Sequence, residues 1–133
     1  MSSTNSTTAF DVSVALASNE SGTDINILTE DAVTAACLGF DLRILQSRDL
    51  HGGDGDHPAT LILIIEEALS CDWSFSVASG SWKRICMNLV SNALKYTPSG
   101  YILVTLRKTL LKRKPGKQQI ALVELTVSWT SNY

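Results

Sequence analysis

The sequence SWKRICMNLVSNALKYTPSG, residues 81–100, predicts an amphipathic helix around which the rest of the chain can be arranged. At about 100° per residue, Asn88, Asn92 and Lys95 fall within roughly 60° of one another on the helical wheel. A wide apolar face of this kind is typical of a helix that lies on a sheet. The apolar face consists of Trp82, Ile85, Cys86, Leu89, Val90 and Ala93.

The polar side of this helix carries two asparagines one turn apart. Asn in mid-helix costs about 0.6 kcal/mol relative to Ala, because its amide competes for backbone hydrogen bonds. A face that is merely solvated would more cheaply carry Glu, Lys or Gln, although a core helix with a polar back remains the simpler alternative. An Asn carbonyl oxygen can ligate a hard cation such as Mg²⁺, and Lys95 can reach a phosphate from the same side.

A resemblance to a known family becomes specific at these residues. The segment MNLVSNALKYTPSGYILVTL, residues 87–106, resembles the N box of the histidine-kinase ATP-binding domain, and the flanking WKRI and TPSG are similar to fungal hybrid histidine kinases. The family pattern is Asn, three residues, Asn-Ala, one residue, then Lys-Tyr/Phe-Thr. This chain matches that pattern throughout, from Asn88 to Thr97.

The resemblance implies a role for each matched residue. Asn92 would ligate Mg²⁺ bound to the ATP phosphates, Lys95 would contact phosphate oxygens, and Tyr96 would pack near the adenine. Asn88 would lie near the phosphates, where other branches of the class carry an acidic base, so it is the catalytic candidate. The implied cofactors are ATP and Mg²⁺. The implied partners are a histidine-kinase dimerisation domain or a response regulator of a two-component phosphorelay.

The expected fold class is α+β: an incomplete two-layer α/β sandwich of the histidine-kinase ATPase type, with helices on one face of a mixed sheet. Apolar or alternating runs predict strands over residues 61–67, 71–78, 101–108 and 120–129, the first of them buried. The last two strands form a hairpin whose tip, residues 112–117, is basic. The predicted inward faces of this hairpin are Ile102, Val104 and Leu106 on one strand and Ala121, Val123, Leu125 and Val127 on the other.

The N-terminal part is expected to differ from the rest. Residues 1–23 are rich in Ser, Thr and Asn, which favours disorder, although Val12, Val14 and Leu16 alternate as in a short edge strand. Residues 24–43 predict a short strand at Ile25 and Ile27. A helix capped by Thr29 then follows, and Gly39 is placed to end it. Ser81 is the expected cap of the helix that carries the two asparagines.

Residues 46–60 contain HGGDGDHP and predict a flexible surface loop. The alternative is a metal-binding loop that uses His51, Asp54, Asp56 and His57. No Walker spacing is present, and the glycines do not join a strand to a helix as a phosphate cradle requires.

Composition limits the remaining possibilities. A chain of 133 residues that is 44% hydrophobic predicts one domain with a core. Its net charge of −2 gives no reason to expect nucleic-acid binding or membrane contact. The N-terminus lacks a signal segment and the longest apolar run is residues 61–65, so we expect a cytoplasmic chain. Cys37, Cys71 and Cys86 have no metal-ligand spacing.

The resemblance ends with the returning strand. In the kinase family an Asp-x-Gly-x-Gly segment follows there and its Asp hydrogen-bonds adenine, whereas here Val127 is followed by SWTSNY. The expected organisation is therefore a disordered segment 1–23, a partial ATPase domain 24–128 and a tail 129–133 outside the resemblance.

Two functions follow from this organisation. The first is a partial ATP-binding domain of a sensor histidine kinase, in which Mg-ATP binding and phosphoryl transfer to histidine are lost or severely weakened. A weaker variant keeps nucleotide binding as a sensor. The alternative is a non-catalytic interaction module that pairs with a full-length kinase or with itself, so whether the chain is an enzyme stays open.

Overall fold

A computed structural model describes residues 6–51, 59–66, 72–97 and 99–131. Two helices and five strands are present within these ranges, and neither helix there has the length and apolar character needed to span a bilayer. In chain order the elements are β1 (Ser6–Asp24), α1 (Ile25–His51), β2 (Thr60–Ile65), β3 (Ser74–Phe75), α2 (Ser79–Tyr96), β4 (Gly100–Leu110) and β5 (Ile120–Ser131).

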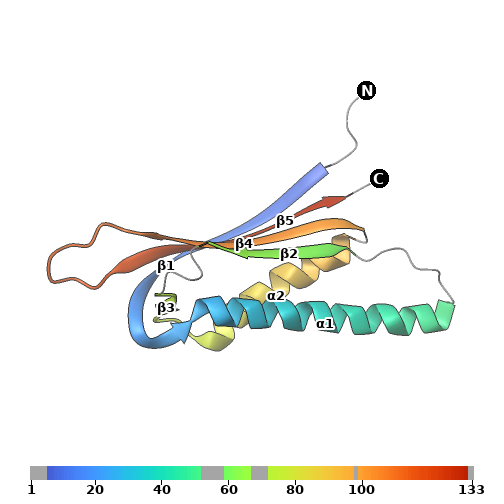
Figure 1. Ribbon diagram of the computed structural model, residues 1–133, viewed down its shortest axis with the longest axis horizontal. Helices are drawn as coiled ribbons and strands as arrows, with labels where there is room; N and C mark the ends of the chain where they lie inside the picture. The colour runs from blue at the N-terminus through green and yellow to red at the C-terminus, as the bar shows by residue number, and fades with distance from the viewer. Residues whose placement is uncertain (1–5, 52–58, 67–71, 98, 132–133) are drawn as a thin grey trace, which may run out of the picture.

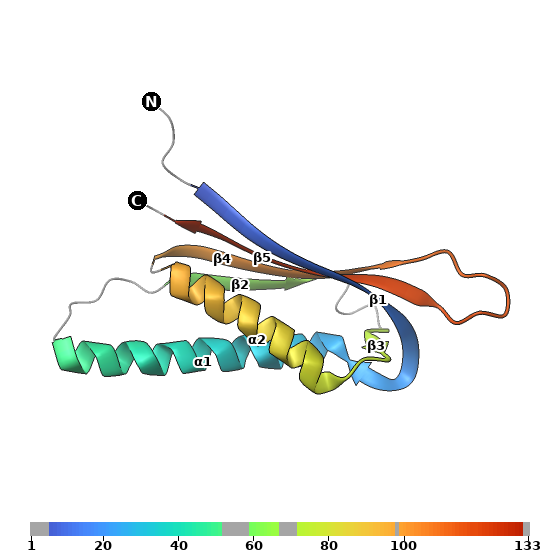
Figure 2. The same cartoon turned by 180° about the vertical axis from the view of Figure 1, so that it is seen from behind.

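The strands form one mixed sheet in the order β2-β4-β5-β1-β3. β2 runs parallel to β4, whereas the other neighbouring strands are antiparallel. Both helices lie on the same side of this sheet, α2 packs against α1, and the opposite face is open (Figures 1 and 2). The expectation of an α+β fold with helices on one face of a mixed sheet is confirmed at this level.

The β4–β5 hairpin forms the centre of the sheet. Its register runs from Gly100 opposite Ser131 to Leu110 opposite Ala121. Alternation places every second residue of each strand under the helices, as predicted, because successive side chains of a strand point to opposite faces. The fully buried side chains of this inner face are Ile102, Val104, Leu106, Ala121, Val123, Leu125 and Val127.

The N-terminal segment is a long strand rather than a disordered tail. β1 pairs with β5 continuously from Ser6 to Ala17, with Val12 opposite Leu125 and Val14 opposite Val123. The expectation of disorder is therefore wrong for residues 6–23, and the alternative of an edge strand was too short. Composition misled because β1 is stabilised by backbone bonds to a strand more than a hundred residues away, which a local count of polar residues ignores.

Helix α1 begins earlier than predicted. The carboxylate Oδ1 of Asp24 accepts a hydrogen bond from the backbone N–H of Ile27 at 3.1 Å, as an N-cap does. The predicted strand at Ile25 and Ile27 is wrong, because both residues lie in the first turn of α1. Thr29 is not the cap but a fully buried residue one turn into the helix.

Helix α1 also ends later than predicted. It runs through Gly39 to His51, so Gly39 does not terminate it, and residues 46–51 are helical rather than loop. An exposed glycine inside a helix costs only about 1 kcal/mol relative to Ala, which the packing of α1 on α2 can offset. Asp54, Asp56 and His57 lie outside the described residues.

The strands β2 and β3 depart from prediction in burial and length. β2 begins one residue before the predicted range 61–67 and ends at Ile65. Leu61, Leu63 and Ile65 pack against the core, whereas Ile62 and Ile64 are exposed, so the prediction of a buried strand is wrong for one face. β3 contains only Ser74 and Phe75, because it pairs with a short bent part of β1. Trp73 and Phe75 are nevertheless both buried.

The two ends of α2 test the capping predictions. Its N-cap is Ala78, which makes no side-chain capping bond, and Ser81 lies inside the helix, so the prediction for Ser81 is wrong. The helix ends at Tyr96 with Thr97 as C-cap, as predicted from the restriction that Pro98 places on the preceding residue.

Two glycines with different surroundings give a test of this packing. The pairing of β1 with β3 jumps from Ser18 to Thr23, both opposite Phe75, and Gly22 lies within this bulge. A Cβ on Gly22 would stand 2.3 Å from the carbonyl oxygen of Phe75, whereas a Cβ on Gly39 meets nothing within 4 Å.

We predict opposite effects of Gly22→Ala and Gly39→Ala on the free energy of unfolding in urea. Gly22→Ala should destabilise by about 2 kcal/mol or more, because the backbone of β3 must move. Gly39→Ala should stabilise by about 0.5–1 kcal/mol, because the site is helical and open. Equal effects of the two substitutions would contradict the described bulge.

Candidate functional site

Helix α2 divides its residues sharply between the core and the surface. Asn88, Asn92 and Lys95 are all exposed, and their spacing of four and three residues puts them on one side of the helix. We call these three residues the polar stripe. The residues buried on the other side, against α1 and the sheet, are Trp82, Cys86, Val90, Ala93 and Leu94.

A buried hydrogen bond fixes how α2 lies against α1. The indole Nε1–H of Trp82 donates to the hydroxyl of Thr29 at 2.8 Å, and both side chains are fully buried. A hydrogen bond of this kind contributes about 1 kcal/mol, and leaving either partner unsatisfied costs about 1–3 kcal/mol. Because this contact sets the rotation of α2 about its axis, it also directs the polar stripe away from α1.

The thiol of Cys86 completes the same buried cluster. Desolvation by burial raises the pKa of Cys86 to about 11, and its hydrogen bond with Thr29 opposes this only in part. Cys86 is fully buried and therefore stays a neutral thiol at physiological pH. It acts as a small core residue, as the sequence indicated, and not as a nucleophile or metal ligand.

The two side-chain amides of the polar stripe are not engaged by the protein. Within the described residues, neither the side chain of Asn88 nor that of Asn92 makes a hydrogen bond. The Nζ of Lys95 lies 5.7 Å from the ring centroid of Tyr96, whose side chain is 55% exposed. The stripe thus offers two free carboxamides, one ammonium and an adjacent aromatic face, which suit a hard cation, an anion and a flat apolar group respectively.

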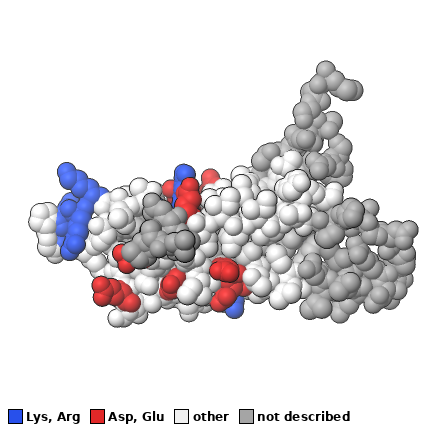
Figure 3. Space-filling model, in the orientation of Figure 1, with Lys and Arg blue, Asp and Glu red and all other residues white. Residues whose placement is uncertain are grey.

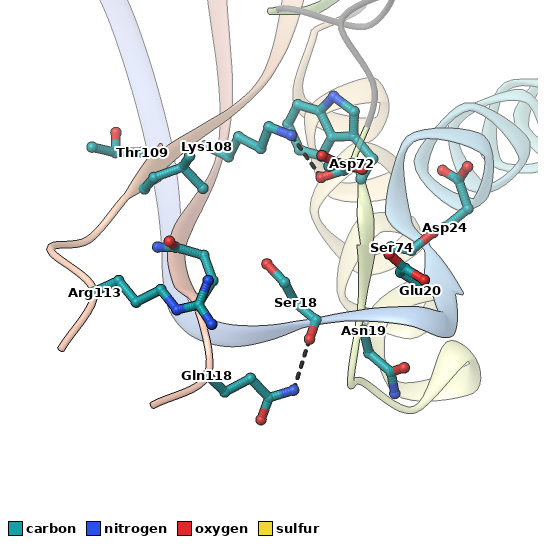
Figure 4. A pocket seen from close by; sticks show the side chains of 13 residues that line it. Ser18, Asn19, Glu20, Asp24, Asp72, Ser74, Lys108, Thr109, Arg113 and Gln118 are labelled. Atoms are coloured by element: carbon teal, nitrogen blue, oxygen red, sulfur yellow. Dashed lines mark hydrogen bonds between the residues drawn. The ribbon is translucent and has the colours of Figure 1, made fainter. Parts of the chain in front are cut away.

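A hollow lies elsewhere on the molecule. It has a volume of about 1120 Å³ and is formed by the bend of β1, the start of β3 and the outer part of the β4–β5 hairpin (Figure 4). Lys108 Nζ donates to the backbone carbonyl of Asp72 at 2.6 Å, and Gln118 Nε2 donates to that of Ser18 at 2.7 Å. No residue of the polar stripe lines this hollow.

Sequence reasoning missed this hollow for a physical reason. Its walls come from four segments that only the folded sheet brings together, and its charges are mixed, with Glu20, Asp24 and Asp72 beside Lys108 and Arg113. Asp72 has a left-handed backbone with φ of 64°, which only the structure reveals. The one signal in the sequence was the basic hairpin tip.

Metal ligands of the usual kind do not gather in the part of the chain that the structure describes: no three His, Cys, Asp or Glu residues come together there. The alternative metal loop depends on Asp54, Asp56 and His57, which lie outside that part, and on the side chain of His51, which does too. The proposed role of Asn92 involves a different donor, an amide oxygen shared with phosphates, and it stays a prediction.

One further polar group lies at the end of α2. The Oγ1 of Thr97 is fully buried and has no hydrogen-bond partner among the described residues. Nothing in the structure explains this, although buried hydroxyls are normally paired.

Comparison of the chain with known protein families, with curated proteins and with solved structures finds no match. The likeness to the N box therefore rests on residues 87–106 themselves and on their arrangement along α2. Functional roles for these residues are proposals drawn from their chemistry.

We predict that Cys86 makes stability fall with rising pH above pH 9. The unfolded thiol loses its proton near its ordinary pKa of 9.0, whereas the folded thiol keeps it until about pH 11. The folded state therefore binds more protons between these values, and its stabilisation, complete below pH 9, is lost as pH rises through 11.

The measurement is urea unfolding of the wild type and Cys86→Ala at pH 7 and pH 10. The stability difference between the two proteins should shrink by about 1 kcal/mol at pH 10, because only the wild type has this thiol. Taking the difference cancels the titration of lysines and tyrosines common to both. A difference independent of pH would contradict burial of the thiol.

Proposed function

We propose that this chain is part of a histidine-kinase-type ATP-binding domain and that α2 binds the metal–phosphate end of Mg-ATP. The observation that carries the proposal is the polar stripe. Asn88, Asn92 and Lys95 are exposed along one side of α2, and the other side of this helix is buried in the core. The arrangement of two helices over one face of a mixed sheet is compatible with such a domain.

The donor set fits a magnesium-bound polyphosphate. The amide oxygen of Asn92 is a neutral hard ligand, which suits a Mg²⁺ ion whose remaining ligands are phosphate oxygens and water. Lys95 supplies a point positive charge one turn further along and can neutralise phosphate oxygens. Asn88, one turn before Asn92, adds an amide near the same phosphates, and the exposed ring of Tyr96 offers a flat surface for the base.

β5 offers no free acidic side chain to hydrogen-bond the adenine amino group. β5 continues to Ser131, and Glu124, which is its one acidic residue, lies 3.5 Å from the guanidinium of Arg107. A buried polar partner for the adenine amino group contributes about 1.5–3 kcal/mol when charged, and β5 does not supply it. Because the stripe is also open to water, where charge interactions are screened, we expect weak nucleotide binding and no independent catalysis.

Isothermal titration calorimetry with a non-hydrolysable ATP analogue and Mg²⁺ tests this proposal. The wild type should bind weakly and lose most of its binding heat when Mg²⁺ is chelated. Asn92→Ala should weaken binding about tenfold, or about 1.4 kcal/mol, because it removes the proposed metal ligand. The variant should fold, because Asn92 is an exposed helical residue whose side chain makes no hydrogen bond within the part of the chain that the structure describes.

A lysine pair provides the matched control. Lys95→Ala should weaken binding, whereas Lys83→Ala, which removes an equally exposed charge from the first turns of α2, should not. Equal heats for the wild type and Asn92→Ala would remove the basis of the proposal. The same protein should take up no radiolabel from γ-labelled ATP, and labelled chain would overturn the expectation of inactivity.

A second candidate function is self-association through β2. In the described sheet β2 pairs on one side only, with β4. On the open face next to this edge, Ile62, Ile64, Tyr101 and Leu103 are all exposed. Natural edge strands are usually protected by charges or proline, and the sequence TLILII of β2 has neither. Two such edges can therefore meet without charge repulsion, which favours a second copy as the partner.

Sedimentation velocity at tens of micromolar protein tests this second candidate. The wild type should form dimers or larger species, and Ile62→Lys with Ile64→Lys should be monomeric, because the charges oppose a symmetric contact. The control is Ile27→Lys with Leu38→Lys, which charges two exposed apolar residues of α1. A monomeric wild type, or equal effects of the two double variants, would rule out an interface at β2.

A further inference from the structure

Helix α2 carries only positive charge. Its charged residues are Lys83, Arg84 and Lys95, and its sequence contains no Asp or Glu. All three of these cations are exposed. The chain as a whole is different, because its 13 acidic residues outnumber its 11 basic ones. The surface of α2 is therefore a local source of positive potential that the net charge of the chain does not reveal.

Arg84 lies in line with the polar stripe. It precedes Asn88 by four residues and Lys95 by eleven, so at about 100° per residue these three side chains fall within roughly 40° of one another around the helix. Lys83 lies on a different side of α2, about 120° or more from every residue of the stripe. Arg84 therefore extends the polar stripe by one turn toward the N-terminus of the helix.

The fold makes no use of the Arg84 guanidinium. Within the ranges that the structure describes, this side chain makes neither a hydrogen bond nor an ion pair. A charged residue on a helix surface is often paired with an opposite charge three or four residues away. The residues at those distances from Arg84 are Gly80, Ser81, Met87 and Asn88, and none of them is acidic. The guanidinium is thus available to an anion that comes from outside the chain.

The proposed nucleotide site gives the polar stripe a direction. Tyr96, whose exposed ring is the proposed surface for the base, is the last residue of α2. A nucleotide with its base at this end directs its phosphates toward the N-terminus of the helix. Long side chains on a helix also lean toward its N-terminus, so a metal ion held by Asn92 lies over the turn that contains Asn88. The terminal phosphate then lies on the side of Arg84.

Distances along the helix restrict what Arg84 can contact. At a rise of about 1.5 Å per residue, its Cα lies about 6 Å before that of Asn88 and about 12 Å before that of Asn92. The first interval is one helical turn, which a long arginine side chain can cover, whereas the second is more than two turns. Arg84 can therefore contact a group held beside Asn88, but not the metal ion proposed at Asn92.

We propose that Arg84 binds the terminal phosphate of the nucleotide and makes the site select a triphosphate over a diphosphate. This inference rests on the function proposed for α2 and adds a specificity-determining residue to it. A guanidinium presents a planar fork of N–H donors that can bind two phosphate oxygens at once, unlike the ammonium of Lys95. A diphosphate whose base is held near Tyr96 ends before Arg84 and leaves this contact unmade.

The charges of the stripe agree with this assignment. With Mg²⁺ bound, a nucleoside diphosphate keeps a net charge of about −1 and a triphosphate about −2, because the terminal phosphate is largely ionised at neutral pH. Lys95 alone balances the charge of the diphosphate, whereas Lys95 and Arg84 together balance that of the triphosphate. The amides of Asn88 and Asn92 are neutral and leave this balance unchanged. Charge and reach therefore favour the same ligand.

General attraction between α2 and any anion is the simpler alternative, and Lys83 separates it from a specific contact. Lys83 is the neighbour of Arg84 in the sequence and is also exposed, but it lies on another side of the helix. General attraction predicts that loss of either cation weakens the binding of diphosphate and triphosphate alike. A contact between Arg84 and the terminal phosphate predicts a loss for the triphosphate alone.

Isothermal titration calorimetry of the full chain with Mg²⁺ and either ADP or a non-hydrolysable ATP analogue tests the proposal. The wild type should bind the ATP analogue several-fold more tightly than ADP. Arg84→Gln should weaken binding of the analogue about fivefold, as expected for an exposed charge-assisted contact, and that of ADP less than about twofold. Arg84→Lys should recover part of the preference, because it keeps the charge but loses the fork. Arg84 is exposed, so both variants should keep the wild-type circular dichroism.

The matched control is Lys83→Gln, which removes the same charge and should bind both nucleotides like the wild type. The role of Arg84 is overturned if the wild type binds ADP as tightly as the analogue, if Arg84→Gln leaves the ratio of the two affinities unchanged, or if Lys83→Gln causes an equal loss. In each of these cases the proposed function stands when Asn92→Ala still weakens binding of both nucleotides. If the wild type binds neither nucleotide in the presence of Mg²⁺, the proposed function fails and the role of Arg84 fails with it.

Discussion

The structure depends on the backbone pairing of β5 with strands on both of its sides. β5 takes β4 from its own hairpin on one side and β1 from the opposite end of the sequence on the other. Its inner face, Ala121, Val123, Leu125 and Val127, is fully buried. Without this strand, β1 would lose its main partner, and the helices would lose part of the surface that covers their apolar sides, because β1 and the neighbouring β3 join the rest of the sheet through β5.

The burial of α2 against α1 and the sheet is what leaves the polar stripe exposed. Trp82 and Cys86 meet Thr29 of α1 in a buried hydrogen-bonded cluster, which fixes the rotation of α2. The two asparagines and Lys95 therefore lie on the solvent side of α2. Their side chains make no hydrogen bond within the described residues. Polar side chains that a helix holds in place, and that make no hydrogen bond to the protein, are available to bind a ligand.

The two functions proposed for this chain depend on different physics. The role proposed for the polar stripe is coordination of a hard cation by an amide oxygen, which depends on precise placement along a helix. The role proposed for the open apolar face beside β2 is pairing with a second copy, because the unpaired edge of β2 lacks the charges that normally prevent strand pairing.

Local patterns in the sequence were sufficient to predict much of this molecule. The 3.6-residue period of residues 81–96 predicted α2 and its polar stripe, and alternation predicted β4, β5 and their inner faces, because in each case a single element's periodicity fixes which side is buried. The end of α2 before Pro98 followed from a steric rule that is equally local.

Tertiary structure decided what local patterns could not. The polar-looking segment 6–24 became a strand because β5 supplied partners for its backbone, and α1 continued past Gly39 because packing on α2 outweighs the small cost of one glycine. β2 kept one face exposed because both helices cover the same side of the sheet. The concentration of positive charge from residues 112–117 at one end of the molecule (Figure 3) likewise arises from the direction in which the β4–β5 hairpin projects, since composition records charges but not their distances.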